Sequence, residues 1–286
     1  MRQMEPSRLP RKVPRGAKGC VVQECRVGLY SFPKCGNTWL RAIVAAMVGI
    51  PQQRDDLQNY LTDIYQGVPY EHSWDFQGRR WYFYKAHHNR VLDRHEGRPL
   101  ATDKVIYIYR HPLDAFLSYL NFASAKVAPQ AGDRFPIAVT SVDELSAEEM
   151  EVFFGIFLEH GTLLPHVEDY GSIFEHARHF IDLAAGGEAV HVLRYEDLSR
   201  DFETEARRIA GFLGLDDIDP DRVFEAAEAR TRKNGRFFWK RKVENYRNYL
   251  TDAQIARFEA RYAPELRRLG YGRDPAAPPQ RAAIKV

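Results

Sequence analysis

The chain has 286 residues, 44% of them hydrophobic, which is enough for the substantial core of one α/β domain. Its 41 basic and 39 acidic residues leave a formal net charge of +2, so no field of one sign covers the molecule and any anion site must be local. The three cysteines, Cys20, Cys25 and Cys35, have neither CxxC spacing nor a nearby histidine pair, which argues against a disulfide framework or a zinc site.

The first 20 residues are basic and rich in proline, and they contain no apolar core that would mark a signal peptide. We expect residues 1–20 to form a disordered basic arm, residues 21–272 to form one folded domain, and residues 273–286 to form a disordered tail. The longest apolar run, residues 42–50, ends at Pro51 and is too short to cross a bilayer. The sequence therefore predicts a cytoplasmic protein without a membrane span.

Residues 27–48, VGLYSFPKCGNTWLRAIVAAMV, join a short apolar strand to a tight glycine-containing turn and an amphipathic helix. Such a junction points backbone N–H groups and the positive end of the helix dipole at one spot, where a phosphate can bind, and Lys34 adds a full charge. The spacing follows the nucleotide P-loop as far as Pro33-Lys34-Cys35, but Cys35 lacks the hydroxyl that binds Mg²⁺ in NTPases. The segment predicts a phosphate site without obligatory Mg²⁺. An ordinary β-turn-α corner with a surface lysine is the alternative.

Short β-rich runs alternate with amphipathic helical patterns along the chain. The runs are residues 27–32, 81–85, 105–109 and 189–193, and the helical patterns are residues 38–48, 112–122, 150–164 and 201–213. We predict an α/β fold, a three-layer α/β/α domain with a central, mainly parallel sheet, in which ligands bind beyond the carboxyl ends of the strands. Residues 51–80 and 124–146 lack a regular pattern and are predicted to be long loops.

The segment WYFYKAHHNRVL ends the second predicted strand with Lys85, His87 and His88. A histidine at a strand terminus is a candidate general base because its unperturbed pKa is about 6.5. Strand alternation places Lys85 and His87 on one side and His88 on the other, which favours His87 as the base. A structural or solvated histidine is the alternative at either position.

A second strand-to-helix junction, VIYIYRHPLDAFLSYLNF, places Arg110 at the end of a strand and Ser118 two helical turns later. Both side chains can then face one phosphate. The alternative is that Arg110 pairs with a surface acid such as Asp114.

The segment RTRKNGRFFWKRK, residues 230–242, is strongly basic and contains no acid. Charge runs of this kind are usually solvated surface or sites for nucleic acid and other polyanions. The interleaved Phe237, Phe238 and Trp239 make a mobile basic flap over a nucleotide equally plausible.

These motifs together resemble the sulfotransferase family that uses 3′-phosphoadenosine 5′-phosphosulfate (PAPS). SFPKCGNTWL resembles the 5′-phosphosulfate loop of that family, and IYRHPLDAFLSY resembles its 3′-phosphate motif. KAH is similar to the family's Lys-Thr-His, LRYEDL to its Tyr-Glu-Asp strand end, and RKVENYRNYLT more loosely to its C-terminal stretch. The five motifs stand in the family's order and span residues 27–251.

The resemblance implies which residues hold the nucleotide. The 5′-phosphosulfate would be held by Lys34, Cys35, Gly36, Asn37 and Thr38, through backbone N–H groups, side chains and the helix terminus. Trp39 would stack on the adenine, with Phe224 as the second face of the slot, and Tyr195 would contact the nucleotide. Arg110 and Ser118 would bind the 3′-phosphate, and Lys240, Arg241 and Lys242 would form the basic flap.

The chain departs from the family pattern at two of these positions. Cys35 replaces the usual serine, which removes a hydroxyl donor and leaves the backbone cradle unchanged. Arg241 stands where the flap normally has glycine, so a register that uses Arg232, Lys233 and Gly235 stays open.

The resemblance implies transfer of a sulfuryl group from PAPS to a hydroxyl of a small-molecule or carbohydrate acceptor. In this mechanism His87 takes the acceptor proton, Lys34 stabilises the bridging oxygen, and Lys85 holds the sulfuryl oxygens, without a metal. One rival is a P-loop kinase or ATPase, although the strand at 105–109 ends in Arg110 where an NTPase would offer Asp. The other rival is a non-catalytic polyanion binder that uses residues 230–242.

The sequence leaves the acceptor and the oligomeric state open, and a nucleic-acid partner is not expected. Aromatic residues in and beside the first predicted loop could line an acceptor pocket or serve local packing. They are Tyr60, Tyr65, Tyr70, Trp74, Phe76 and Trp81.

Overall fold

The computed structural model describes residues 23–51, 53–127, 141–165, 167–232 and 242–272. The predicted N-terminal arm, the predicted C-terminal tail, and the flap residues Lys240 and Arg241 lie outside these ranges. The predicted flap is therefore described only at its last residue, Lys242.

A six-stranded sheet forms the centre of the fold, with five strands in the order β2-β4-β1-β7-β8 and β3 paired to β4. Every neighbouring pair along that path is parallel, and β3 is antiparallel to β4. The strands are β1 Gln23–Tyr30, β2 Leu61–Asp63, β3 Trp74–Phe76, β4 Arg79–Ala86, β7 Lys104–Tyr109 and β8 Val190–Arg194, and β5 Arg94–His95 and β6 Arg98–Pro99 form a separate ribbon. The predicted α/β class with a mainly parallel sheet is confirmed.

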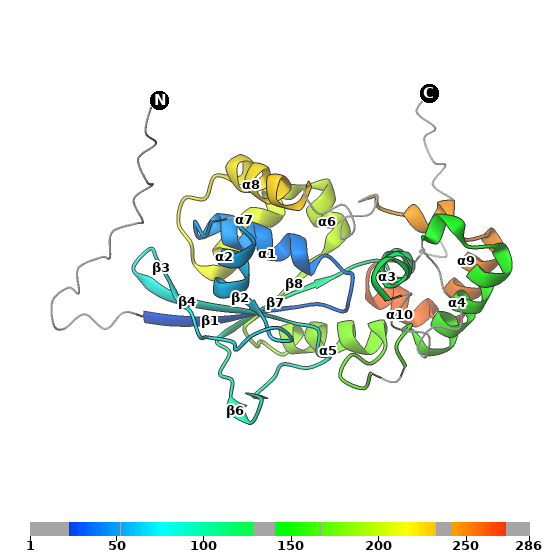
Figure 1. Cartoon of the computed structure of the whole chain (residues 1–286), viewed down its shortest axis with the longest axis horizontal. Helices are drawn as coiled ribbons and strands as arrows, with labels where there is room; N and C mark the ends of the chain where they lie inside the picture. The colour runs from blue at the N-terminus through cyan, green and yellow to red at the C-terminus, as the bar shows by residue number, and fades with distance from the viewer. Residues whose placement is uncertain (1–22, 52, 128–140, 166, 233–241, 273–286) are drawn as a thin grey trace, which may run out of the picture.

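Helices cover both faces of this sheet and extend beyond its edge (Figure 1). The helices are α1 Asn37–Met47, α2 Arg54–Tyr60, α3 Pro112–Val127, α4 Ala147–His160, α5 Ile173–Ala185, α6 Tyr195–Arg200, α7 Phe202–Leu213, α8 Pro220–Arg232, α9 Asp252–Arg261 and α10 Ala263–Arg268, with short 3-10 turns η1 Val142–Glu144 and η2 Asn245–Asn248. Figure 1 shows α1, α7 and α8 over one face and α5 over the other, with α3, α4, α9 and α10 grouped at one side. This arrangement gives the predicted layers.

Two apolar clusters form the core, one on each face of the sheet. One joins α1, α7 and α8 to the sheet through residues such as Leu40, Ile209 and Val223. The other joins α3, α4, α5 and α9 to the opposite face through residues such as Phe116 and Phe157. The central strands are buried on both sides, which is why their sequences read as nearly continuous apolar runs.

The register brings the carboxyl ends of the central strands to one edge. Tyr30 of β1 lies opposite Ala86 of β4 and Tyr107 of β7, and Tyr109 of β7 lies opposite Arg194 of β8. The residues that follow these ends are therefore neighbours in space, although they are far apart in the sequence. Four of the predicted functional residues, Lys34, His87, Arg110 and Tyr195, follow the ends of β1, β4, β7 and β8.

The structure corrects several predicted elements. The predicted loop 51–80 is wrong, because it contains α2, β2 and β3, and the two strands have only three residues each, too few to show a period. In 124–146, α3 continues to Val127 and η1 follows at Val142–Glu144, while residues 128–140 lie outside the description. The helix predicted at 150–164 is α4, which begins at the capping box of Ser146 and Glu149 and ends at Gly161, where φ is 65°.

In the ranges that the structure covers, none of the helices is long and apolar enough to span a membrane.

Candidate active site

The loop between β1 and α1 has an unusual backbone at two residues. Lys34 has a φ of 68° and Gly36 a φ of 106°, both in the left-handed region. A Cβ atom at Gly36 would lie 2.7 Å from Cδ2 of Tyr195, so only glycine fits this position. Gly36 is also the N-cap of α1, and a glycine brings no side-chain oxygen to the N–H groups of the first turn. That helix end can accept the oxygens of an anion.

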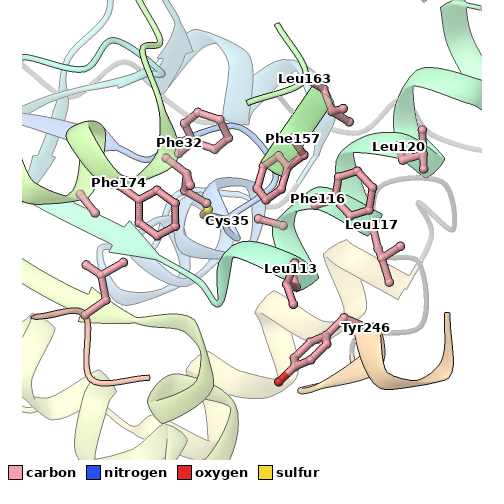
Figure 2. Close-up of a cluster of buried hydrophobic side chains, with 14 of the residues drawn as sticks. Phe32, Cys35, Leu113, Phe116, Leu117, Leu120, Phe157, Leu163, Phe174 and Tyr246 are labelled. Carbon is pink, nitrogen blue, oxygen red and sulfur yellow. The ribbon is translucent and has the colours of Figure 1, made fainter. Parts of the chain in front are cut away.

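Cys35 points away from this helix end and into the core. Its side chain is fully buried beside Phe32 in the apolar cluster of Figure 2. Burial raises the pKa of the thiol to about 12, so the thiol is neutral at physiological pH. The backbone N–H of Cys35 donates to the carbonyl of Phe32 at 3.3 Å. The structure therefore gives Cys35 a packing role in the loop.

The other loop residues divide between framework and surface. The Asn37 side chain is buried and donates to the Leu29 carbonyl at 3.1 Å and to Ser31 Oγ at 3.3 Å, which fastens the loop to β1. Thr38 is exposed. The Lys34 ammonium lies 4.4 Å from the centre of the Phe122 ring on α3, the helix that carries Ser118.

His87 directly follows β4 and is held against the loop. Its Nδ1 lies 2.7 Å from the Ser31 carbonyl oxygen, which can only accept, so Nδ1 carries the proton. Burial lowers the pKa of His87 well below its usual value, and the positive charge of Lys85 lowers it further. A neutral imidazole protonated at Nδ1 has its lone pair at Nε2. His87 therefore has the protonation state that a general base needs.

Lys85 lies beside His87 in a buried ion pair. Its ammonium is 2.8 Å from Asp63 Oδ2, and the two side chains are only 12% and 11% exposed. Burial lowers the pKa of Lys85, while Asp63 opposes that shift. Lys85 and His87 both contact the ring of Tyr65, so they lie on one side as predicted. The prediction that His88 lies opposite is wrong, because β4 ends at Ala86 and His88 Nδ1 is 3.1 Å from Tyr65 Oη.

Arg110 follows β7 and is buried. Its guanidinium lies 4.5 Å from the centre of the Tyr195 ring, and its Nη2 donates to the Lys242 carbonyl at 3.1 Å. Asp114 is not a surface acid as the alternative supposed: it is buried, 3.9 Å from Arg110 Nη2, and accepts from the Glu244 and Tyr246 N–H groups at 2.8 and 3.0 Å. Among the residues that the structure describes, the buried Nε of Arg110 has no hydrogen-bond partner, as expected for a group that binds an anion.

Ser118 lies two turns further along α3 and is half-buried. The Lys242 side chain is exposed. Its backbone carbonyl accepts the hydrogen bond from Arg110, so the end of the basic segment lies beside the predicted 3′-phosphate motif. The predicted flap and the predicted 3′-phosphate motif are therefore joined by a hydrogen bond.

Aromatic rings extend from Trp39 to α8. Trp39 packs edge-on against Tyr195 at 5.5 Å between ring centres and lies 6.2 Å from Phe202. Phe202 in turn packs against Phe224 at 5.0 Å, and Phe224 is 39% exposed. Phe202 therefore stands between the two residues expected to enclose the adenine. In the described ranges, the buried Nε1 of Trp39 has no partner.

A small pocket opens beside the loop and His87. Its walls come from the loop, α3, α4 and the segment after α4, and Tyr170 in its wall also packs edge-on against His87 at 6.2 Å. The lining residues are Phe32, Pro33, Ala115, Phe116, Tyr119, Phe157, Thr162, Leu163, Leu164 and Tyr170. The aromatic residues proposed from the first predicted loop do not line it. Tyr60 packs against Trp74 at 5.0 Å on the α1 side of the sheet, whereas Tyr65 reaches His87.

Sequence reasoning did not predict the contacts of several residues that hold the site together, although it named Tyr65 as a possible pocket residue. Ser31 fixes the His87 tautomer, Asp63 holds Lys85, and Tyr65 and Tyr170 pack on His87. Glu196 accepts from the His111 N–H at 2.9 Å and from Tyr271 Oη at 2.6 Å, which ties the ends of β7 and β8 to the end of the described chain. Ser31 and Glu196 stood in recognisable motifs, SFPKCGNTWL and LRYEDL, but no role was predicted for either side chain or backbone group.

The mainly parallel α/β sheet has at its strand ends a helix N-terminus that can accept an anion, a buried arginine and a neutral histidine, an arrangement that suits an enzyme acting on a phosphate-bearing donor. The chain belongs to the sulfotransferase family: its residues 26–270 match the family model described as "Sulfotransferase domain". The resemblance drawn from the motifs is confirmed.

Known proteins similar to this chain agree with the assignment. It is 22% identical over 266 residues to flavonol 3-sulfotransferase of Flaveria bidentis (82% of this chain, 79% of that protein) and 25% identical over 273 residues to cytosolic sulfotransferase 6 of Arabidopsis thaliana (80% and 74%). The structure of mouse sulfotransferase SULT7A1 complexed with PAP superposes with a TM-score of 0.53 at 19% identity, covering 85% of this chain and 84% of that chain. That likeness shows a shared fold.

Proposed function

We propose that this protein transfers the sulfuryl group of PAPS to the hydroxyl of a small apolar acceptor, with His87 as the general base. The observation that carries the proposal is the Nδ1 hydrogen bond of His87 to Ser31, because it leaves a basic Nε2 on a histidine that packs against Tyr170 in the wall of an apolar pocket. A cytoplasmic enzyme fits the names of the cytosolic relatives.

The residues present fit the donor nucleotide. The helix end at Gly36 and the charge of Lys34 suit the 5′-phosphosulfate. The buried Nε of Arg110, which has no partner within the described ranges, suits the 3′-phosphate. PAPS supplies an activated sulfuryl group on an anhydride oxygen.

In the transfer step, His87 Nε2 accepts the hydroxyl proton while the acceptor oxygen forms its bond to sulfur. Lys34 and the N-terminus of α1 stabilise the negative charge on the bridging oxygen as the donor's sulfur–oxygen bond breaks. Lys85, held by Asp63, supplies a fixed positive charge near the sulfuryl oxygens and keeps His87 unprotonated. The step needs no metal.

The pocket favours an apolar acceptor over a carbohydrate. Its lining is mostly aromatic and aliphatic, with the hydroxyls of Tyr119, Thr162 and Tyr170 as its polar groups. Relatives named flavonol 3-sulfotransferase and 3-alpha-hydroxysteroid sulfotransferase, the latter from Cavia porcellus and 28% identical over 199 residues, are in keeping with this acceptor class.

A thermal-shift comparison tests the donor. PAP, the bisphosphate product of the donor, should stabilise the fold by about 2.7 kcal/mol at 100 times its dissociation constant, whereas ATP-Mg²⁺ and GTP-Mg²⁺ should have little effect. The shift with PAP should shrink in Lys34→Ala. A shift with ATP-Mg²⁺ and none with PAP would favour the kinase alternative and overturn the proposal.

Variants of His87 test the base. His87→Ala should lower kcat by about 10²- to 10⁴-fold with PAPS and 2-naphthol, or with the best acceptor from a panel of phenols, flavonols and hydroxysteroids, and PAP affinity should barely change. His87→Asn is the matched control, because its amide can keep the donor to Ser31 while the basic nitrogen is lost. It should be as inactive as His87→Ala. Unchanged turnover in His87→Asn would rule out His87 as the base.

A further inference from the structure

His176 is a buried histidine on α5 that takes no part in the proposed chemistry. It has no exposed surface, and both of its ring nitrogens have partners. Nε2 lies 3.1 Å from the backbone carbonyl oxygen of His87, and Nδ1 lies 3.1 Å from the hydroxyl of Tyr107 on β7. The ring thus connects α5 and β7 to the residue proposed as the base.

The direction of both hydrogen bonds follows from the groups involved. A carbonyl oxygen only accepts, so Nε2 of His176 donates to His87. Burial lowers the pKa of His176 to about 3, so the ring is neutral and Nδ1 must accept. The Tyr107 hydroxyl, which is fully buried, is the donor to Nδ1. One tautomer of His176 therefore satisfies both buried partners.

The same ring also packs against the phosphosulfate loop. His176 lies edge-on to Phe32 of that loop, with ring centres 5.8 Å apart, and it stacks on Tyr107 at 5.4 Å. Phe32 follows Ser31, whose carbonyl accepts from His87 Nδ1. A closed circuit of contacts results: His176 to His87, His87 to Ser31, and Phe32 back to His176.

We propose that His176 is a positioning residue, which holds the backbone at His87 and the phosphosulfate loop at a fixed separation so that Nε2 of His87 meets the acceptor hydroxyl. This role rests on the proposed function of His87. Misplacement of a reacting group by about 1 Å can cost about 10²-fold in rate, so loss of the bond should reduce turnover while the nucleotide site is preserved.

The test compares variants that differ at this hydrogen bond. His176→Leu removes the donor and should lower kcat by about 10- to 100-fold, with the PAP dissociation constant within about twofold of wild type. His176→Gln keeps an N–H in reach of the His87 carbonyl and should recover most of kcat. Tyr107→Phe, which removes the donor to Nδ1 and leaves the ring in place, should lower kcat by a smaller factor and remains informative if His176→Leu does not fold.

Phe180→Leu is the control for packing, because Phe180 is fully buried and stacks on Tyr107 at 4.3 Å without a hydrogen bond of its side chain. Its stability should fall while kcat stays within about threefold of wild type. The proposal is overturned if His176→Leu keeps wild-type kcat, if His176→Gln is as impaired as His176→Leu, or if Phe180→Leu loses as much kcat. A wild-type enzyme that transfers no sulfuryl group overturns the proposed function itself, and this result is obtained before any variant is made.

Discussion

Arg110 shows how one residue type suits two tasks in this site. Its guanidinium is rigid and planar, so it can stack on Tyr195, donate to the Lys242 carbonyl, and still direct Nε elsewhere. A lysine would keep the charge and lose this geometry. A substitution of Arg110 can therefore show whether charge or shape matters more in its proposed contact with the 3′-phosphate.

Arg110→Lys tests whether a positive charge without the planar donors is enough for PAP affinity. The variant keeps a charge near Asp114 but loses the planar donors, so PAP affinity should fall by about 10- to 100-fold, in line with charge-assisted hydrogen bonds of about 1.5–3 kcal/mol. AMP lacks the 3′-phosphate, so its affinity should stay within about twofold. Isothermal titration of both nucleotides provides the measurement. Equal losses for PAP and AMP would show that Arg110 does not recognise the 3′-phosphate.

The position of a residue relative to a strand end predicted its place in the site better than its amino-acid type predicted its contacts. Lys34, His87 and Arg110 were predicted at the site because each stands just after a strand, a position that the chain pattern reveals, whereas Tyr195 was predicted from the family resemblance. The orientation of Cys35 could not be predicted, because it depends on the left-handed backbone of Lys34 and Gly36 on either side. Ser31 was also missed, since it contributes a backbone carbonyl and any residue type supplies one.

At the scale of elements, length decided which strands were predicted. The central strands were predicted because both of their faces are apolar, whereas β2 and β3 are too short to carry a period. Helix α5 was missed, although Ser172 and Glu175 form a capping box at its start that could have revealed it. Because α5 was not predicted, the contact between His176 on this helix and His87 was not predicted either.

The junction of the loop and α1 yields a prediction with an internal control. Gly36→Ala would bring a Cβ to 2.7 Å from Tyr195, in addition to the strain of a φ of 106°. Gly49→Ala, at the end of α1, imposes a similar strain at a φ of 74°, but a Cβ there meets nothing within 4 Å.

Gly36→Ala should therefore lose more stability than Gly49→Ala, and it should also weaken PAP binding by at least about tenfold because Tyr195 must move. Gly49→Ala should lose about 1–2 kcal/mol of stability and keep its PAP affinity. Urea denaturation and isothermal titration measure the two effects. Equal PAP affinity in the two variants would argue against contact between Gly36 and Tyr195 as a determinant of the site.

On the scale of the whole molecule, the described C-terminal segment closes the fold over the strand ends. Residues 242–272 contact the site through hydrogen bonds. The Lys242 carbonyl accepts from Arg110, and the Glu244 and Tyr246 N–H groups donate to Asp114. The Tyr271 hydroxyl donates to Glu196. His111 lies between this segment and the sheet, stacked on Tyr246 at 4.5 Å and edge-on to Tyr271 at 4.8 Å. The site therefore depends on contacts between residues that are 75 to 132 positions apart in the sequence.

Two histidines, His111 and His176, make the free energy of unfolding sensitive to acid. Burial lowers the pKa of His111 and of His176 to about 3, and the charges of Arg247 and Arg110 add to the effect at His111. Both groups titrate near pH 6.5 in the unfolded chain, to within about one unit. As the pH falls below that value, the unfolded chain binds protons that the folded chain cannot, so the free energy of unfolding decreases. Each histidine should cost about 2 kcal/mol of stability between pH 7 and pH 5.

His111→Asn tests this linkage, because an asparagine oxygen can still accept from the Leu113 N–H, as His111 Nδ1 does at 3.3 Å, but does not titrate. The loss of unfolding free energy between pH 7 and pH 5, measured by urea denaturation, should be about 2 kcal/mol smaller in this variant than in wild type. If His111→Asn loses as much unfolding free energy between pH 7 and pH 5 as wild type, His111 is protonated in the folded chain at pH 5. The segment that it contacts would then have opened to solvent.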